Sequence, residues 1–492
     1  MNKINIANAR LVFFSIFTIL VAYGFALTNY SLTVDNEVPA YPDASLNLGR
    51  WGTNLIHYHI FHGHDPYITL LISLLLLGVA ATTLSDIFKL KGINGYLFCG
   101  LFLTFPQMAY QMVFIMQSVG IALGFLLSAV ALKLYIKSSH NFLAPSSIIN
   151  LVASSIIIMF VVAIYQALVL IPVTIYIIYT FQNTYLEEFS IKTEFKKALY
   201  FGAMMLLALV LYYISTKILC PPAPNGGSFL SSYLAGTDTS NPFIKFFHIL
   251  TKNFVGSFYY GNRTFILATI ATVALIIKFI IARKHALIRS LLLLVFIILP
   301  YIFSFFITNG YHPPRIYLTS GIVFAFVIVQ VLSGIKYEKQ VVWACSIVCL
   351  INIYFVSSLY YSANKISKHD EALARKIDNI IQTKYPDFNP ASDYVFFYGG
   401  LPYEHHSEYR LNDSEIFGGS ILNWDNGSNF RIICLFKSHD IANYRYPDSK
   451  EAYDKAKLAA TAMPVWPNKE SIQKVDNVVI IKLNNNEGQP LF

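Results

Sequence analysis

Residues 67–85 read YITLLISLLLLGVAATTLS, an uncharged, mostly apolar stretch close to the length of about 20 residues that an α-helix needs to cross a bilayer. Similar runs recur from residue 11 to about residue 360. Of the 492 residues, 55% are hydrophobic and only 13% are charged, whereas soluble domains contain about a quarter charged residues. The sequence therefore predicts a polytopic α-helical membrane protein.

The apolar runs predict about eleven transmembrane helices. Their centres lie near residues 20, 76, 103, 127, 156, 173, 208, 273, 298, 325 and 350. The runs over 95–136 and 147–182 are too long for one crossing, so we expect each to divide into a hairpin of two helices.

The distribution of Lys and Arg predicts the orientation, because these residues are retained on the cytoplasmic side of a membrane. Alternate connections contain Lys89 and Lys91, Lys133 and Lys137, Lys192, Lys196 and Lys197, Arg283, Lys284 and Arg289, and Lys336 and Lys339. We therefore expect the N-terminus in the cytoplasm and everything after about residue 361 on the opposite side. The net charge of +9 then reflects topology and not nucleic-acid binding.

The composition changes near residue 361, which predicts a membrane domain over 1–360 and a small α/β domain outside the membrane over 361–492. In the second domain, EALARKIDNIIQTKY and SKEAYDKAKLAATAM have helical patterns, and YVFFYGG, FRIICLF and NVVIIKL resemble short buried strands. The membrane domain has two large outward loops, 31–66 and 217–262. The second loop ends amphipathically, which suits a segment on the membrane surface.

Acidic residues gather in the first outward loop and are absent from the depths of the predicted spans. A proton-coupled transporter would carry ionisable groups at membrane depth, so we place any chemistry at the outer surface. A carboxylate there can act as a general base that takes a proton from an incoming hydroxyl. Asp35 and Glu37 are the candidates, although acids also serve solubility in such a loop.

Three arginines, Arg50, Arg315 and Arg263, are candidates for gripping a departing phosphate, because the guanidinium fork matches phosphate oxygens. Arg50 beside Trp51 can equally be an interfacial anchor.

Other polar and aromatic residues are candidates for binding substrate. Gln107 and Gln111 place two amides on one helix face, where they can hold sugar hydroxyls or bond between helices. Asp43 and Trp51, in the first outward loop, are further candidates.

Histidines and cysteines give no metal-site pattern. His57, His59, His62 and His64 precede Asp65, but their spacing matches no strong zinc motif, so we interpret them as interfacial or cavity-lining residues. The five cysteines also lack metal-ligand spacing, and we expect the outward Cys220 and Cys434 to be unpaired thiols. We expect no metal and no cofactor.

Several motifs together carry a family resemblance: VDNE at 34–37, LNLGRW at 46–51, HPPR at 312–315, FGGSILNWDNGSNFRI at 417–432 and MPVWP at 463–467. In this combination the chain resembles, over nearly its whole length, the serotype-converting O-antigen glucosyltransferases of phages and enteric bacteria. The resemblance implies a GT-C type membrane fold in the bacterial inner membrane.

The resemblance also implies the reaction. Glucose would move from undecaprenyl phosphate glucose to a sugar hydroxyl of the O-antigen on the periplasmic face, within a pathway that includes a cognate flippase and a bactoprenol glucosyltransferase. Asp35 matches the family's acidic motif, but the choice between Asp35 and Glu37 as base stays open.

The resemblance leaves further roles open. Trp424 and Asp425 in WDNGSN are candidates for sugar contact or for a structural turn, and we expect the outer domain to shape acceptor recognition. The alternatives are a lipid or sugar flippase, or a GT-C enzyme that modifies another envelope glycan or lipid A.

Overall fold

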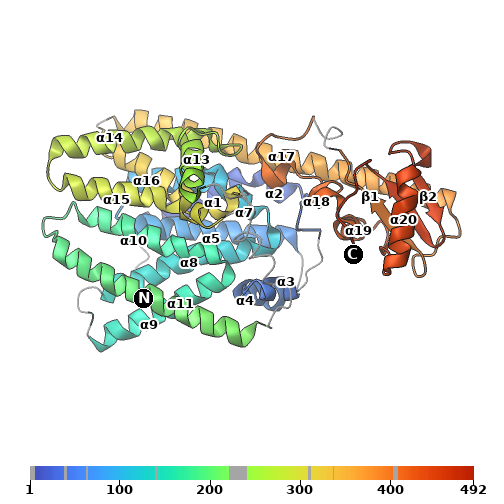
Figure 1. Cartoon of the computed structure of the whole chain (residues 1–492). Helices are drawn as coiled ribbons and strands as arrows, with labels where there is room; N and C mark the ends of the chain where they lie inside the picture. The colour runs from blue at the N-terminus through green and yellow to red at the C-terminus, as the bar shows by residue number, and fades with distance from the viewer. Residues whose placement is uncertain are drawn as a thin grey trace. The chain divides into compact units, whose positions relative to one another are not determined.

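The structure is a computed structural model that describes residues 6–37, 42–61, 65–138, 142, 144–220, 241–307, 312–335, 337–402 and 408–491 (Figure 1). The chain forms two compact units, here called the membrane unit (residues 1–27 and 42–357) and the C-terminal unit (residues 28–41 and 358–492). The sequence predicted a division at 360/361 and kept 31–66 together as one loop. In the structure that loop is shared, because residues 28–41 belong to the C-terminal unit.

The membrane unit is helical. In chain order it contains α1 (Ile6–Ala22), α2 (Gly24–Thr28), α3 (Pro42–Asn47), α4 (Trp51–Asn54), the π-helix η1 (Leu55–Ile60), α5 (Pro66–Ile87), α6 (Ile93–Thr104), η2 (Pro106–Met108), α7 (Ala109–Met112), α8 (Ile115–Ser138), α9 (Pro145–Ile164), η3 (Gln166–Val169), α10 (Leu170–Asn183), α11 (Ile191–Leu219), α13 (Pro242–Phe254), η4 (Asn262–Phe265), α14 (Ile266–Ala282), α15 (Ala286–Ile298), η5 (Leu299–Phe305), η6 (Pro314–Ile316) and α16 (Ser320–Leu332). The division between the units falls inside α17 (Glu338–Lys384), which is a single helix.

Within the described residues, eight helices are long and apolar enough to cross a membrane, and three shorter apolar helices accompany them, over 9–22, 93–104 and 320–332. Each predicted span centre lies within one of the helical segments. These helices confirm the prediction of a polytopic helical protein. The number of crossings and the GT-C fold stay predictions.

The two long apolar runs divide as expected. In the first, α6 ends at Thr104 and Pro106 opens η2, because a proline cannot continue the hydrogen-bonding pattern of the helix before it. In the second, Tyr165 adopts an extended conformation between α9 and η3. Both breaks put non-helical backbone inside the bundle, where buried polar groups must be satisfied locally.

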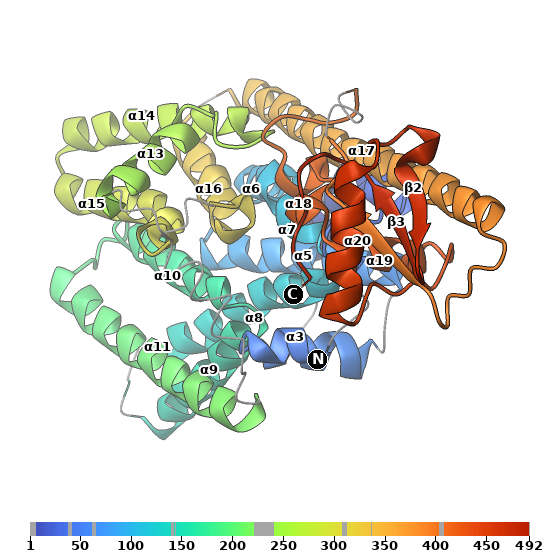
Figure 2. The same cartoon turned by 45° about the vertical axis from the view of Figure 1, so that its right-hand side comes forward.

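The bundle is built around α8, which packs against α5, α9 and α10. From α5 the packing continues through α1 and α6 to α16, and from α16 through α14 and α15 back to α10 (Figures 1 and 2). α11 packs on α9. The large rings at the centre of this arrangement, including Phe102, Phe105 and Phe125, are fully buried.

The C-terminal unit is an α/β domain with a three-stranded sheet in the order β1-β3-β2. Its elements after α17 are β1 (Tyr394–Tyr398), η8 (Glu415–Gly418), α18 (Trp424–Gly427), α19 (Asn429–Ser438), α20 (Lys450–Ala462), η9 (Lys469–Ser471), β2 (Ile472–Val475) and β3 (Val478–Lys482). β1 pairs parallel with β3, and β2 pairs antiparallel with β3. α20 packs its buried face, including Tyr453 and Ala456, on Phe396 and Ile480 of the sheet.

One predicted strand is wrong. The segment FRIICLF forms part of α19 and not a strand. A short apolar run does not distinguish a buried strand from a buried helix by its pattern alone. In α19 the buried positions Ile432, Leu435 and Phe436 follow helical spacing, and the side chain of Arg431 is only 16% exposed.

Candidate functional site

Arg431 is the centre of a charge cluster inside the C-terminal unit. Its Nη2 donates to Asp35 Oδ1 at 2.9 Å and its Nη1 donates to Glu37 Oε1 at 2.5 Å. Its Nε donates to Asp425 Oδ2 at 2.7 Å. The two acids predicted as candidate bases therefore share one arginine, and Asp425, predicted as a substrate contact, braces the same guanidinium.

The backbone of the segment 28–37 is held in the C-terminal unit by hydrogen bonds to side chains of α17 and α19. Ser367 Oγ accepts a hydrogen bond from the Leu32 amide at 3.0 Å, and Asn364 Nδ2 donates to the Tyr30 carbonyl at 3.1 Å. The Glu37 carbonyl accepts from Ser438 Oγ at 3.0 Å, at the end of α19. These bonds fix the backbone from which both acids project.

The motif WDNGSN forms a tight turn. Asp425, Asn426 and Gly427 have φ angles of 51°, 58° and 81°, in the left-handed region that Asn, Asp and Gly tolerate best. A Cβ at Gly427 would lie 2.5 Å from the Gly399 carbonyl oxygen, so only glycine fits where the turn meets the end of β1. The turn directs Asp425 toward Arg431.

Asn429, the last residue of that motif, ties α19 to the sheet. Its buried side chain accepts from the Phe397 amide at 2.7 Å and donates to the Phe397 carbonyl at 3.0 Å. Trp424 lies against Gly419, where an added Cβ would come within 2.8 Å of the indole ring. Of the two roles left open for WDNGSN, the structure shows the turn, and sugar contact by Trp424 stays a prediction.

The carboxylates of the cluster differ in their access to solvent. The side chain of Asp35 is 40% exposed, whereas that of Glu37 is 0% exposed. Among the described residues, Glu37 Oε2 has no hydrogen-bond partner. Of the two candidate bases, only Asp35 therefore presents a carboxylate to an incoming molecule, and the side chain of Asp425 is 46% exposed.

Burial and the neighbouring opposite charges shift the pKa values of Glu37 and Arg431 in opposite directions. Burial raises the pKa of Glu37 to about 7 although the Arg431 guanidinium lowers it, and the Asp35 charge adds to the rise. Burial alone would lower the pKa of Arg431, but the carboxylates of Asp35, Glu37 and Asp425 together hold that pKa above its usual value. The arginine is therefore charged throughout the physiological range.

In the membrane unit, three predicted residues lie around the break between α6 and α8. Gln107 Nε2 donates to the Pro314 carbonyl at 3.0 Å, next to Arg315, whose guanidinium lies 4.9 Å from the centre of the Phe114 ring. Gln107 and Gln111 are fully buried, and within the described part of the chain the Oε1 atom of each has no hydrogen-bond partner. Two buried acceptors and an arginine thus occur at one break, a polar arrangement that can receive hydroxyl donors and an anion.

Arg50 and Trp51 lie at the second break. Arg50 Nε donates to Gln166 Oε1 at 3.1 Å, and its guanidinium lies 4.6 Å from the centre of the Tyr165 ring. The Trp51 ring packs against Phe160 at 5.7 Å. Both residues therefore contact the helix bundle, and the choice between phosphate binding, substrate binding and an interfacial anchor stays open for them.

The remaining predicted residues have less structural support. Arg263 is exposed on η4. Asp43 lies in α3, but its side chain is outside the described part, as are His62 and His64.

Among the residues that the structure describes, no group of three or more His, Cys, Asp or Glu side chains is arranged to hold a metal ion. Cys220 and Cys434 are both free thiols, as expected.

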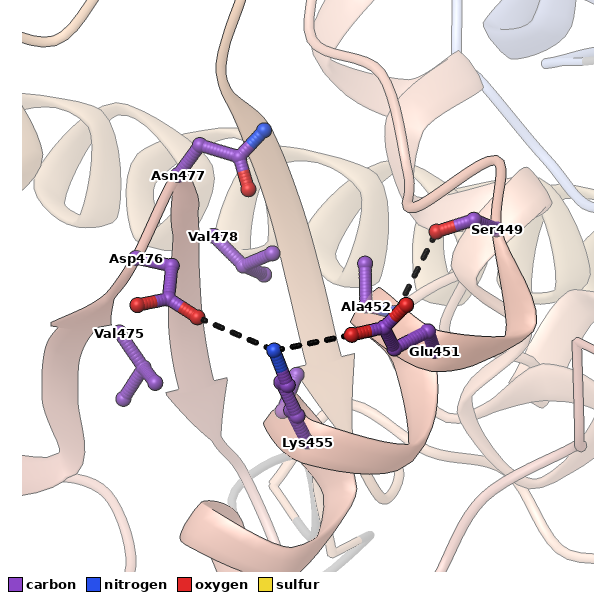
Figure 3. Close-up of a pocket in the computed structure, with 9 residues that line it drawn as sticks. Ser449, Glu451, Ala452, Lys455, Val475, Asp476, Asn477 and Val478 are labelled. Carbon is purple, nitrogen blue, oxygen red and sulfur yellow. Dashed lines mark hydrogen bonds and ion pairs between the residues drawn. The ribbon is translucent and has the colours of Figure 1, made fainter.

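A pocket in the C-terminal unit lies between α20 and the β2–β3 turn (Figure 3). Lys455 Nζ lies 3.1 Å from Glu451 Oε1 and 3.9 Å from Asp476 Oδ2. All three side chains are more than half exposed, so these ion pairs are screened by solvent and contribute little to stability. Ser449 accepts from the Ala452 amide and caps α20. The pocket brings together no buried or unpaired reactive group, so we assign it no chemistry.

Sequence reasoning missed Arg431. The signals were its place in the motif FGGSILNWDNGSNFRI and its position as a single charge inside the apolar run FRIICLF, where a charge must find a partner. Reading that run as a strand concealed the face from which the arginine projects.

Comparison with known proteins gives one result. A family model described as Glucosyl transferase GtrII matches residues 24–330, which is more than half of the chain. The matched range contains Asp35 and Glu37 and ends before Arg431 and Asp425. No curated protein matches the chain.

Proposed function

Because the chain belongs to the glucosyl transferase GtrII family and is therefore a glycosyltransferase, we propose that it moves glucose from undecaprenyl phosphate glucose to an O-antigen sugar hydroxyl. The reaction takes place on the periplasmic face of the inner membrane. In this topology the N-terminus is cytoplasmic and the C-terminal unit is periplasmic. The partners are the lipid-linked donor, the O-antigen acceptor, a cognate flippase and a bactoprenol glucosyltransferase.

In the proposed reaction, the acceptor oxygen forms a bond to C1 of glucose as the bond from C1 to the phosphate oxygen breaks. The electron pair of the broken bond leaves with the lipid phosphate, and the acceptor proton must go to a base. Asp35 is that base. The observation that carries this assignment is that, of the two acids predicted as candidate bases, Asp35 has a 40% exposed carboxylate held on one oxygen by Arg431, whereas Glu37 is 0% exposed.

Glu37 is the poorer candidate, although its position in the sequence is equally suitable. Its side chain is fully buried, so an acceptor hydroxyl has no route to it without movement of the segment 28–37. Burial also favours the protonated form of Glu37, and a protonated carboxyl cannot accept the proton. We assign Glu37 to holding Arg431.

The membrane unit binds the donor in this proposal. Arg315 pairs with the phosphate, whose negative charge grows as the bond to C1 breaks. The unpartnered Oε1 atoms of Gln107 and Gln111 accept hydroxyl donors of the glucose. Arg50, already bonded to Gln166, is a second cation for the phosphate. The exposed Arg263 is a third candidate.

The proposal is tested with the purified full-length protein in vesicles, supplied with synthetic undecaprenyl phosphate carrying radiolabelled glucose and with a lipid-linked O-antigen repeat. We expect label to move to the acceptor, and we expect the Lys455→Ala variant to transfer at the wild-type rate because Lys455 lies in the solvent-exposed pocket. Transport of the lipid without transfer would identify a flippase. Transfer of another sugar but not glucose would identify a different enzyme of the same membrane class.

A further inference from the structure

All three nitrogens of the Arg431 guanidinium are occupied by carboxylates. Nε, Nη1 and Nη2 donate to Asp425, Glu37 and Asp35, at 2.7, 2.5 and 2.9 Å. Asp35 and Asp425 against one guanidinium leave the cluster with a formal excess of one negative charge, which rises to two when Glu37 is also ionised. An arginine surrounded in this way is a poor partner for a substrate phosphate, because the anion would have to displace a carboxylate and enter a negative site.

The arrangement at Asp35 is one-sided. Arg431 bonds to Oδ1, and within the part of the chain that the structure describes Oδ2 accepts no hydrogen bond. A carboxylate fixed on one oxygen and open on the other has a defined direction in which it can accept a proton. General bases work when their geometry is fixed in this way before the substrate arrives.

We propose that Arg431 is the positioning residue for the base and orients Asp35 Oδ2 toward the acceptor hydroxyl. This inference rests on the proposed function, in which Asp35 is the base. Arg431 itself touches neither substrate. The C-terminal unit then takes part in the chemistry and not only in acceptor recognition.

Arg431 is suited to this task because it is itself held. Asp425 braces Nε from the left-handed turn, and the Asn429 amide fixes the start of α19 to Phe397 of β1. The side chain of Arg431 is only 16% exposed, so solvent competes weakly for its hydrogen bonds. The family match ends at residue 330, so the match gives no information about this residue.

The competing explanation is that Arg431 only fastens the segment 28–37 to α19. The two explanations differ in what happens to the pH dependence of transfer. A nearby positive charge favours the ionised form of a carboxylate, so its removal moves the acidic limb of the pH–rate profile to higher pH only where that carboxylate is the base. Among the described residues, the titratable or charged groups that interact with Asp35 or Glu37 are Arg431, Tyr30 and Cys434. Asp425 interacts with Arg431, and Lys437 interacts with Cys434.

The test compares Arg431→Gln, Arg431→Lys and a matched control, Arg375→Gln, in the full-length protein. Arg375 belongs to an exposed ion pair with Glu371 in the same unit. For Arg431→Gln we expect kcat per folded molecule to fall about 100-fold, a typical effect of a misplaced catalytic group, with the donor KM nearly unchanged. We also expect the acidic limb to move to higher pH. Arg375→Gln should match wild type in both readouts.

Arg431→Lys is a second variant at the same position, included in case Arg431→Gln does not fold. It keeps the positive charge but cannot reproduce the hydrogen bonds of all three guanidinium nitrogens. We expect this variant to lose kcat while its acidic limb stays near that of wild type. Wild-type kcat per folded molecule in both Arg431 variants, or an unmoved acidic limb in Arg431→Gln, would overturn the inference.

The double variant Asp35→Asn with Arg431→Gln separates this inference from the proposed function. If the two residues act as one unit, the double variant should transfer no more slowly than Asp35→Asn alone. Loss of activity in Asp35→Asn together with a fully active Arg431→Gln overturns only the role of Arg431. Full activity in Asp35→Asn overturns the assignment of Asp35 as base and with it the role of Arg431, whereas absence of glucose transfer by the wild-type protein overturns the proposed function itself.

Discussion

Glu37→Gln should make the C-terminal unit more stable at alkaline pH. The wild-type side chain is 0% exposed, and burial raises its pKa from 4.5 to about 7 against the opposing effect of Arg431. Because the pKa in the folded state exceeds that in the unfolded state, the stabilisation from bound proton is complete below about pH 4.5 and is lost as the pH rises toward 7. Gln keeps the shape of the protonated form and cannot ionise.

The size of the effect follows from the shift. A change of one pKa unit corresponds to about 1.4 kcal/mol, so the shift from 4.5 to about 7 gives an upper limit on the order of 3 kcal/mol. We expect the variant to exceed wild type by up to this amount at pH 8 and to equal it near pH 4.5. Arg431 stays paired in the variant because Asp35 and Asp425 remain.

Cys434 provides a local assay in the full-length protein, because this thiol is buried in the same unit and free. With the other four cysteines replaced by alanine, the rate of maleimide labelling at increasing urea concentration reports opening of the C-terminal unit, at pH values where the thiol chemistry is calibrated with a denatured sample. A variant that is less stable than wild type at pH 8 by about 3–5 kcal/mol would refute the reasoning, since that loss is typical of breaking a net-favourable buried ion pair.

Three further predictions concern the turn, the donor site and the topology. Gly427→Ala places a Cβ 2.5 Å from the Gly399 carbonyl oxygen at a φ of 81° and should destabilise the C-terminal unit by about 2 kcal/mol or more, measured by the same Cys434 labelling. Arg315→Ala should raise the donor KM roughly 10-fold or more, because a hydrogen bond to a charged group contributes about 1.5–3 kcal/mol, and an unchanged KM would remove Arg315 from the donor site. Single cysteines introduced at the predicted loops should react with an impermeant reagent from the periplasmic side at positions 35, 315 and 424 and only from the cytoplasmic side at 91, 137 and 284, and a cytoplasmic position 424 would contradict the orientation.

The membrane helices were predictable from sequence because they depend on a local property. A run of apolar residues satisfies its own backbone as a helix wherever it lies in lipid. The break at Pro106 was also encoded locally, since proline cannot continue a helix. The predicted hairpin division of 95–136 therefore agrees with the separate helices α6 and α8.

The charge cluster was not predictable, because it joins residues far apart in the chain. Asp35 and Glu37 were identified as a pair, but their partner Arg431 lies on a segment whose apolar run gave the wrong secondary structure. The turn through Asp425 and Gly427 was recognised as a motif, yet its function in bracing Arg431 depends on tertiary contacts. No periodicity in the sequence encodes such contacts.

The most direct test of the central claim is the rate of glucose transfer by purified Asp35→Asn, measured beside Glu37→Gln and Lys455→Ala with the same labelled donor. A positioned general base contributes about 100 to 10,000-fold, so we expect Asp35→Asn to lose at least about 100-fold in kcat while expression and donor binding stay near wild type. Lys455→Ala should transfer normally, and Glu37→Gln should retain most of its activity. If Asp35→Asn keeps more than about a tenth of the wild-type rate, well short of that expected loss, Asp35 is not the base and the account is contradicted.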